Sequence, residues 1–199
     1  MSAGRLERVL GLIDRANSQD PNTVIDNGNE RPTELVYGER MSSKLDQFCE
    51  TASDHLQIAV RAQHIERWMC PRDSYPAGRT GYLKWRTDLK SYHARRAGEL
   101  MHDAGYGQPD LDRVATLIKK QGIKRDPEVQ TLEDVVCLVF LEHYAGDFIA
   151  RHEDDKVTDI LRKTARKMSP QGVSAATKLN LPDRLGRLLV KTIADVGAN

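Results

Sequence analysis

The stretch TLEDVVCLVFLEHYAGDFIA, residues 131–150, decides the fold class because it is the most apolar segment of the chain. The continuous apolar run within it, residues 135–141, could also form a buried strand. Thr131 and Asp134, however, make a start similar to a capping box, and the apolar pattern continues to Phe148. We therefore expect a central helix at this position.

Helical periodicity is also found on both sides of this segment. We predict a first helix that ends at Asp20-Pro21-Asn22, because proline interrupts the helical hydrogen-bond ladder. A polar loop should follow it, and no hairpin between alternating strands is expected. The remaining helices are expected at about residues 33–52, 53–69, 82–102, 110–121, 155–168 and 181–196, with a further start at Ser169-Pro170. The sequence thus predicts an all-α, single-domain helical bundle over residues 1–199.

The composition suits one globular domain. Hydrophobic residues make up 39% and charged residues 30% of the 199-residue chain, a balance typical of a folded protein. The net charge of +1 gives no global field that would attract nucleic acid or an anionic membrane. Cys49, Cys70 and Cys137 are widely spaced, which argues against a disulfide framework or a zinc ribbon. No apolar stretch is long enough to span a membrane, and we expect a cytoplasmic protein.

The segment RAQHIERW, residues 61–68, is the first candidate for a functional site. On a helix, Arg61, His64 and Trp68 would share one face, with Arg67 beside them. His64 then either pairs with a buried carboxylate or belongs to a binding site, because polar groups in a core are seldom unpaired. The small residues around His93 let another helix approach closely, which would bring His93 near His64.

Three acidic residues of the central segment could complete a site with these histidines. They are Glu133, Asp134 and Glu142. Asp134 either supplies a ligand or stabilises the dipole of the helix that it opens. Glu142 follows the apolar run and must face a cation, a metal ion or water, and a salt bridge to Arg61 or Arg67 is the structural alternative.

A loop rich in arginine and aromatic residues lies between the two histidines. Arginine pairs with phosphate or carboxylate through two hydrogen bonds, and aromatic rings stack on bases. The loop could therefore clamp a nucleotide, or its rings could simply hold it to the surface. The candidate substrate-binding residues are Arg61, Arg72, Arg79, Trp85 and Arg86.

Two basic clusters, residues 119–125 and 162–167, could contact RNA phosphates. Charge runs on helices are more often solvated faces, so both interpretations stay open.

Four motifs resemble those of an uncharacterised microbial family, domain of unknown function 4202. They are DPN at residues 20–22, RAQHIxRW at 61–68, the segment 75–86, and DPEVQTLED at 126–134. Together they span nearly the whole chain, and the chain is identified as a member of this family on their account. The family name implies no activity.

More distantly, the order of these residues is similar to that of the HD-domain metal-dependent phosphohydrolases. Those are helical bundles in which histidines and aspartates from separate helices bind divalent metal ions. The resemblance implies an HD-like fold in which a divalent metal ion is bound by His64, His93, Glu133 and Asp134. Ile65 stands at the position of that family's paired aspartate, so the implied site is atypical.

Two functions are predicted from these residues and resemblances. The first is a metal-dependent hydrolase of a phosphorylated or nucleotide-like substrate, in which the metal ion activates water. Glu142 and Arg67 would act in catalysis, and the arginines of the loop would bind the phosphate. The second is a non-catalytic HD-like domain that binds a nucleotide, RNA such as tRNA, or a partner protein.

Overall fold

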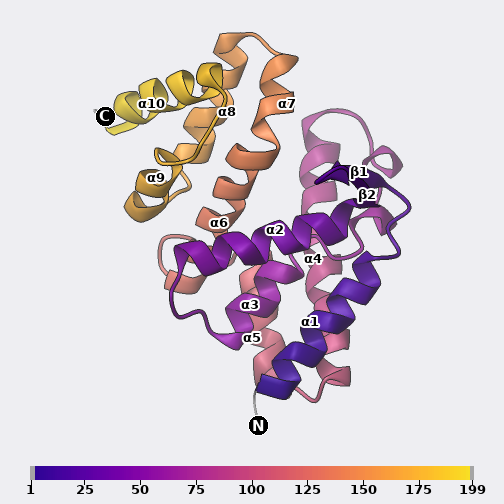
Figure 1. The fold of residues 1–199 in the computed structure, drawn as a ribbon. Coiled ribbons are helices and arrows are strands. Elements are labelled where there is room, and N and C mark those ends of the chain that lie inside the picture. Colours follow the sequence, from indigo (N-terminus) through magenta and orange to yellow (C-terminus); the bar gives the residue numbers. More distant parts are fainter. Residues whose placement is uncertain (1–2, 198–199) are drawn as a thin grey trace. The chain divides into compact units, whose positions relative to one another are not determined.

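The computed structural model describes residues 3–197 and confirms the all-α fold class, since only one short hairpin accompanies its helices (Figure 1). None of the helices in this range combines the length and apolar character that a membrane crossing requires. The chain forms two compact units. Unit 1 comprises the chain up to Asp46 and Glu50–Gln121, and unit 2 comprises Gln47–Cys49 and the chain from Gly122 onward. This division does not test the prediction of one domain, because two compact units can still unfold cooperatively.

Unit 1 is built mainly from helices that pack on α4 and α5. Helix α4 lies against α5, α3 lies against α5, and α1 contacts both α3 and α4 (Figure 1). Its elements are α1 (Ala3–Asn17), β1 (Thr23–Asp26), β2 (Asn29–Pro32), most of α2 (Thr33–Phe48), α3 (Asp54–Arg61), η1 (Arg67–Met69), η2 (Arg72–Ser74), α4 (Gly78–Asp103) and α5 (Gln108–Lys119). Its buried side chains include Ile13, Met41, Leu56, Ile65, Met101 and Leu117.

The polar loop expected after α1 is an antiparallel hairpin, so this prediction was wrong. In this hairpin, Thr23 of β1 pairs with Pro32 of β2, and the pairing continues to Asp26 and Asn29 beside the turn. Asn27-Gly28 forms the turn, and both residues have positive φ, of 50° and 79°. A two-residue hairpin turn requires this conformation, and Asn-Gly is the dipeptide that favours it. The strands were overlooked because each has only four residues and little apolar alternation.

Helix α3 is shorter than predicted. Ser53 caps it by accepting a hydrogen bond from the backbone amide of Leu56, but the helix ends at Arg61. Turns follow, and Glu66 adopts a left-handed conformation with φ of 48°. The prediction that Arg61 and His64 share a helical face with Trp68 is therefore wrong.

A contact from α1 explains the early end of α3. The backbone amide of Glu66 donates to Oδ1 of Asn17, at 2.9 Å, instead of continuing a helical ladder. Local periodicity carries no sign of a partner 49 residues away, so the sequence pattern could not reveal this break.

Unit 2 holds the remaining helices. Helix α8 lies against α10, and α6 contacts α7 and α9 (Figure 1). The helices are α6 (Pro127–His143), α7 (Ala145–Ala150), α8 (Asp154–Ala165), α9 (Pro170–Ala176) and α10 (Asp183–Gly197). Their shared apolar core includes Leu138, Leu141, Ile149, Val157, Leu161, Leu185 and Leu189.

The predicted central helix is confirmed as α6, with different ends. Asp126 caps it by accepting from the backbone amides of Glu128 and Val129, so the predicted start at Thr131 was wrong. Proline at the first helical position explains this earlier start, because its missing N–H would have no helical partner there. The helix ends at His143, and α7 continues after Tyr144. The predicted cap at Ser169 is confirmed, since its side chain accepts from the amide of Gly172.

Candidate functional site

His64 lies at the centre of a polar cluster in unit 1. Its ring stacks on Tyr37 of α2, with centroids 3.9 Å apart and planes 9° apart. The ring of His93 from α4 lies 6.1 Å away, and Nδ1 of His64 is 3.3 Å from Oε2 of Glu34. We call Glu34, Tyr37, His64, Arg67 and His93 the His64 cluster.

Arg67 determines the tautomer of His64. Its Nη1 lies 3.1 Å from Nε2 of His64. A guanidinium group can only donate, so Nε2 must be the accepting, unprotonated nitrogen. The ring proton is then on Nδ1, which faces the carboxyl group of Glu34. His64 is thus a neutral base whose lone pair meets a fixed positive charge.

Burial and nearby cations keep His64 neutral. The pKa of His64 lies well below its ordinary value of 6.5. Burial of the ring lowers this pKa most, and the positive charges of Arg67, Lys120 and Arg86 lower it further. One edge of the cluster still reaches solvent, because the side chains of His64 and Arg67 are 26% and 33% exposed. The combination of several cations and a solvent edge suits an anionic ligand.

Glu34 supplies the buried carboxyl group of the cluster. Its side chain is 11% exposed, and Oε1 lies 3.9 Å from Nε of Arg67. The pKa of Glu34 is raised from 4.5 to about 7, mainly by burial; the charge of Arg67 opposes this shift, and the nearby charge of Asp20 makes a smaller contribution that favours it. Glu34 can therefore exchange a proton near neutral pH.

His93 adds a second neutral imidazole. Its Nδ1 donates to the carbonyl oxygen of Ile65 over 2.7 Å, because that oxygen can only accept. Nε2 is therefore the accepting nitrogen, and it has no hydrogen-bond partner among residues 3–197 although the side chain is 1% exposed. Burial, followed by the neighbouring His64, lowers the pKa of His93 to about 3.

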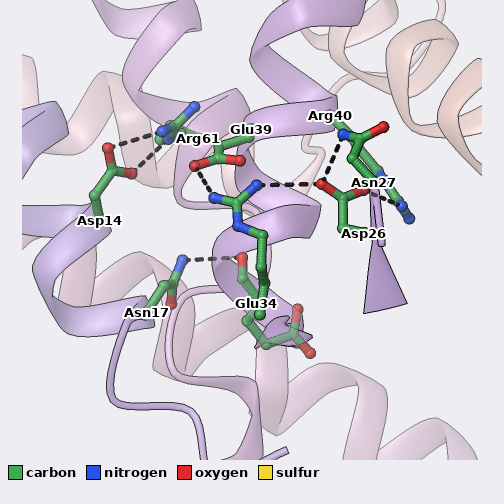
Figure 2. Close-up of polar contacts among 9 residues, drawn as sticks. Asp14, Asn17, Asp26, Asn27, Glu34, Glu39, Arg40 and Arg61 are labelled. Carbon is green, nitrogen blue, oxygen red and sulfur yellow. Dashed lines mark hydrogen bonds and ion pairs between the residues drawn. The ribbon is translucent and has the colours of Figure 1, made fainter. Parts of the chain in front are cut away.

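Asn17 joins the two backbone segments that present Glu34 and His64. This buried side chain donates from Nδ2 to the carbonyl oxygen of Glu34, at 3.4 Å (Figure 2), and accepts from the amide of Glu66 through Oδ1. The carboxylate of Glu66 in turn accepts from Arg96 and from the hydroxyl of Tyr92. These contacts hold the left-handed residue between His64 and Arg67 in place.

Trp85, predicted as a substrate-binding residue, contacts the cluster through Arg67 and positions it. The guanidinium carbon of Arg67 lies 5.1 Å from the centroid of the buried Trp85 ring. The indole N–H donates to the carbonyl oxygen of Cys70 at 2.9 Å, which fixes the ring. The face of Trp85 that a substrate would need is therefore occupied by Arg67.

The four predicted substrate-binding arginines differ in their surroundings. Arg61 makes two hydrogen bonds to the carboxylate of Asp14, at 2.6 and 2.7 Å (Figure 2). Arg72 donates to the carbonyl oxygens of Tyr75 and Pro76 and so holds its own loop. Arg79 is exposed on the first turn of α4. Arg86, also exposed, lies over the ring of Tyr82.

The three predicted acids belong to unit 2. Asp134 is buried and accepts hydrogen bonds from the amide and hydroxyl of Ser169 and from Gln130, so it joins α6 to the start of α9. Buried Glu133 lies 3.8 Å from Nζ of Lys167. Glu142 lies 3.4 Å from His143. Arg61 and Arg67, the predicted salt-bridge partners of Glu142, have contacts within unit 1.

The predicted four-residue metal site is not contained in either unit alone, because its histidines lie in unit 1 and its acids in unit 2. Among residues 3–197, no three His, Cys, Asp or Glu side chains are arranged as metal ligands. The metal ion therefore stays a prediction.

Sequence reasoning missed Glu34 and Tyr37 as members of the cluster. A glutamate in the first turn of a helix normally only stabilises the helix dipole, so nothing local marks Glu34 as functional. Lys120 was considered only as part of a basic cluster. It ends α5 in a left-handed conformation, and its charge acts on His64.

We predict that Glu34→Gln changes how stability depends on pH. Because the folded state binds the Glu34 proton more tightly than the unfolded state, the wild-type free energy of unfolding should fall as pH rises from 4.5 to 7. Glutamine has no charge to bury, so the stability of the variant relative to wild type should rise by about 3 kcal/mol across this window. Urea unfolding between pH 4 and 8 measures this, and a difference that does not change with pH would contradict it.

Comparison with known proteins matches residues 7–189 to the family described as Domain of unknown function (DUF4202). Neither a curated protein nor a solved structure matches the chain significantly. The similarity to HD-domain proteins therefore stays a prediction. The matched region includes every member of the His64 cluster and covers most of the sequence, so the chain belongs to the DUF4202 family.

Proposed function

We propose that unit 1 binds a phosphorylated small molecule at the His64 cluster and hydrolyses its phosphate ester. One observation carries this proposal: Arg67 donates to Nε2 of a neutral His64 whose other ring nitrogen faces the buried carboxyl group of Glu34. A base oriented by a carboxyl group is the arrangement that general-base catalysis needs. The adjacent guanidinium is the group that recognises phosphate.

The arrangement supports a simple sequence of steps. A bound phosphate would attract Arg67, which withdraws its hydrogen bond from Nε2 of His64. His64 then accepts a proton from a water molecule, the water oxygen bonds to phosphorus, and the ester P–O bond breaks. The departing oxygen takes a proton from solvent, and Glu34 stabilises the imidazolium until His64 returns its proton. The products are inorganic phosphate and an alcohol.

No step of this proposal passes through a metal ion. The described residues of unit 1 do not by themselves fit a metal centre, because no three of their His, Cys, Asp or Glu side chains are arranged as ligands. The HD-domain resemblance implies a divalent metal ion. Phosphate release is therefore measured with magnesium, with manganese and with a chelator.

Binding without turnover is the second candidate, and one contact favours it. While Arg67 occupies Nε2, His64 cannot accept a proton from water. A ligand that failed to displace the guanidinium would be bound but not hydrolysed. Measuring binding and phosphate release on the same samples separates the two candidates.

We expect Arg67→Gln to weaken phosphate binding by about tenfold or more, because a charge-assisted hydrogen bond contributes about 1.5–3 kcal/mol. Isothermal titration calorimetry with inorganic phosphate measures the dissociation constant. Arg8→Gln is the matched control, since Arg8 is an exposed arginine of α1 and the variant removes the same charge. Phosphate that binds wild type and both variants equally, or that binds none of them, would contradict the proposal.

A further inference from the structure

Several exposed apolar side chains follow Arg67 in the chain. Residues 3–197 hold only a few large apolar side chains that are strongly exposed. Three of them occur between η1 and the start of α4: Met69 (60%), Tyr82 (43%) and Leu83 (52%). A single exposed apolar side chain needs no explanation, but a group of them beside an anion-binding site points to a ligand with an apolar part.

Tyr82 is the exposed aromatic ring of this group. Its centroid lies 5.8 Å from that of Trp85, with an angle of 46° between the planes. Trp85 is itself buried and covered by Arg67, so it cannot receive a ligand ring on that face. The exposed phenol thus extends the aromatic surface outward from Arg67.

Arg86 connects Tyr82 to the His64 cluster. Its guanidinium carbon lies 5.9 Å from the centroid of the Tyr82 ring, and Nη1 donates to the phenol oxygen at 3.3 Å. The same arginine is one of the cations that lower the pKa of His64. The positive charge of Arg86 therefore contacts the exposed ring and also acts on His64.

We propose that Tyr82 is a stacking surface for the base of a nucleoside monophosphate, whose phosphate is held by Arg67 and Arg86. This inference rests on the proposed function and narrows its substrate class. A nucleotide combines a flat aromatic ring with a phosphate, and it would use both the exposed ring and the cations. A sugar phosphate would use the cations and leave Tyr82 in water.

Calorimetric titration of AMP, ribose 5-phosphate and inorganic phosphate into the full-length protein tests this inference. We expect wild type to bind AMP at least about fivefold more tightly than ribose 5-phosphate, which is the lower end of the effect of one stacked base. Tyr82→Ala should remove this preference for AMP over ribose 5-phosphate. Tyr82→Phe, which keeps the ring, should retain it.

The outcomes separate this inference from the proposed function. Equal affinity of wild type for AMP and ribose 5-phosphate would overturn the stacking surface but leave phosphate binding intact. A preference for AMP that survives Tyr82→Ala would also overturn it, because the base would then be bound elsewhere. Failure of all three compounds to bind would overturn the proposed function itself.

Discussion

His64→Gln is expected to lower the rate of phosphate release by about 10²–10⁴-fold, the contribution typical of a general base. Glutamine fills much of the imidazole volume and can still accept a hydrogen bond from Arg67, but it cannot take a proton from water at neutral pH. The affinity for the phosphorylated ligand should therefore change little while turnover is lost. Phosphate release and calorimetric affinity, measured on the same preparation, separate the two effects.

His55→Gln is the matched control for this experiment. His55 lies on α3, and its Nε2 is 2.8 Å from Oδ1 of Asp110, outside the His64 cluster. This variant should retain wild-type turnover. Turnover that is unchanged in His64→Gln, or lost equally in both variants, would show that His64 is not the base.

Gly81→Ala is expected to destabilise unit 1 by about 3 kcal/mol or more, because the added methyl group meets rigid backbone. A Cβ at Gly81 would lie 1.9 Å from the carbonyl oxygen of Pro76. The same carbonyl accepts from Arg72, so the loop before α4 cannot move away without losing that hydrogen bond. Urea unfolding followed by tryptophan fluorescence measures the loss, and both tryptophans, Trp68 and Trp85, lie in unit 1.

Gly98→Ala, on the same helix, gives a control with the opposite sign. There the nearest atoms to a new Cβ are side-chain carbons of Leu111 at 3.8 and 3.9 Å, which is ordinary contact. Replacing a helical glycine with alanine should then raise the free energy of unfolding by about 0.5–1 kcal/mol. If Gly81→Ala were as stable as wild type, the close approach of Pro76 to α4 would be refuted.

The helices were predictable because their signals are local. Apolar periodicity and proline-containing breaks located α1, α4, α5 and α6 to within a few residues at most ends. The errors have physical causes that lie outside the local pattern. The break after Arg61 depends on Asn17, and the hairpin depends on the turn conformation of Asn27-Gly28 more than on its strands.

The candidate site was only partly predictable. His64 and His93 could be paired from sequence because small residues beside His93 suggested a close helical approach, and their rings do lie 6.1 Å apart. Glu34 could not be found, since it resembles an ordinary first-turn glutamate and becomes unusual only through burial. Arginine content alone could not separate Arg67, which faces His64, from Arg61, which pairs with Asp14.

The bridge made by Asn17 has a consequence for the gene as well as for the protein. Helix α1 contributes no proposed catalytic group, yet its last residue binds the carbonyl of Glu34 and the amide of Glu66. Translation begun at an internal start codon such as Met41 would discard Asn17 and Glu34 together. A start just after α1 would keep every proposed catalytic side chain. Such a polypeptide would still lack the Asn17 side chain that links the backbone segments of Glu34 and His64.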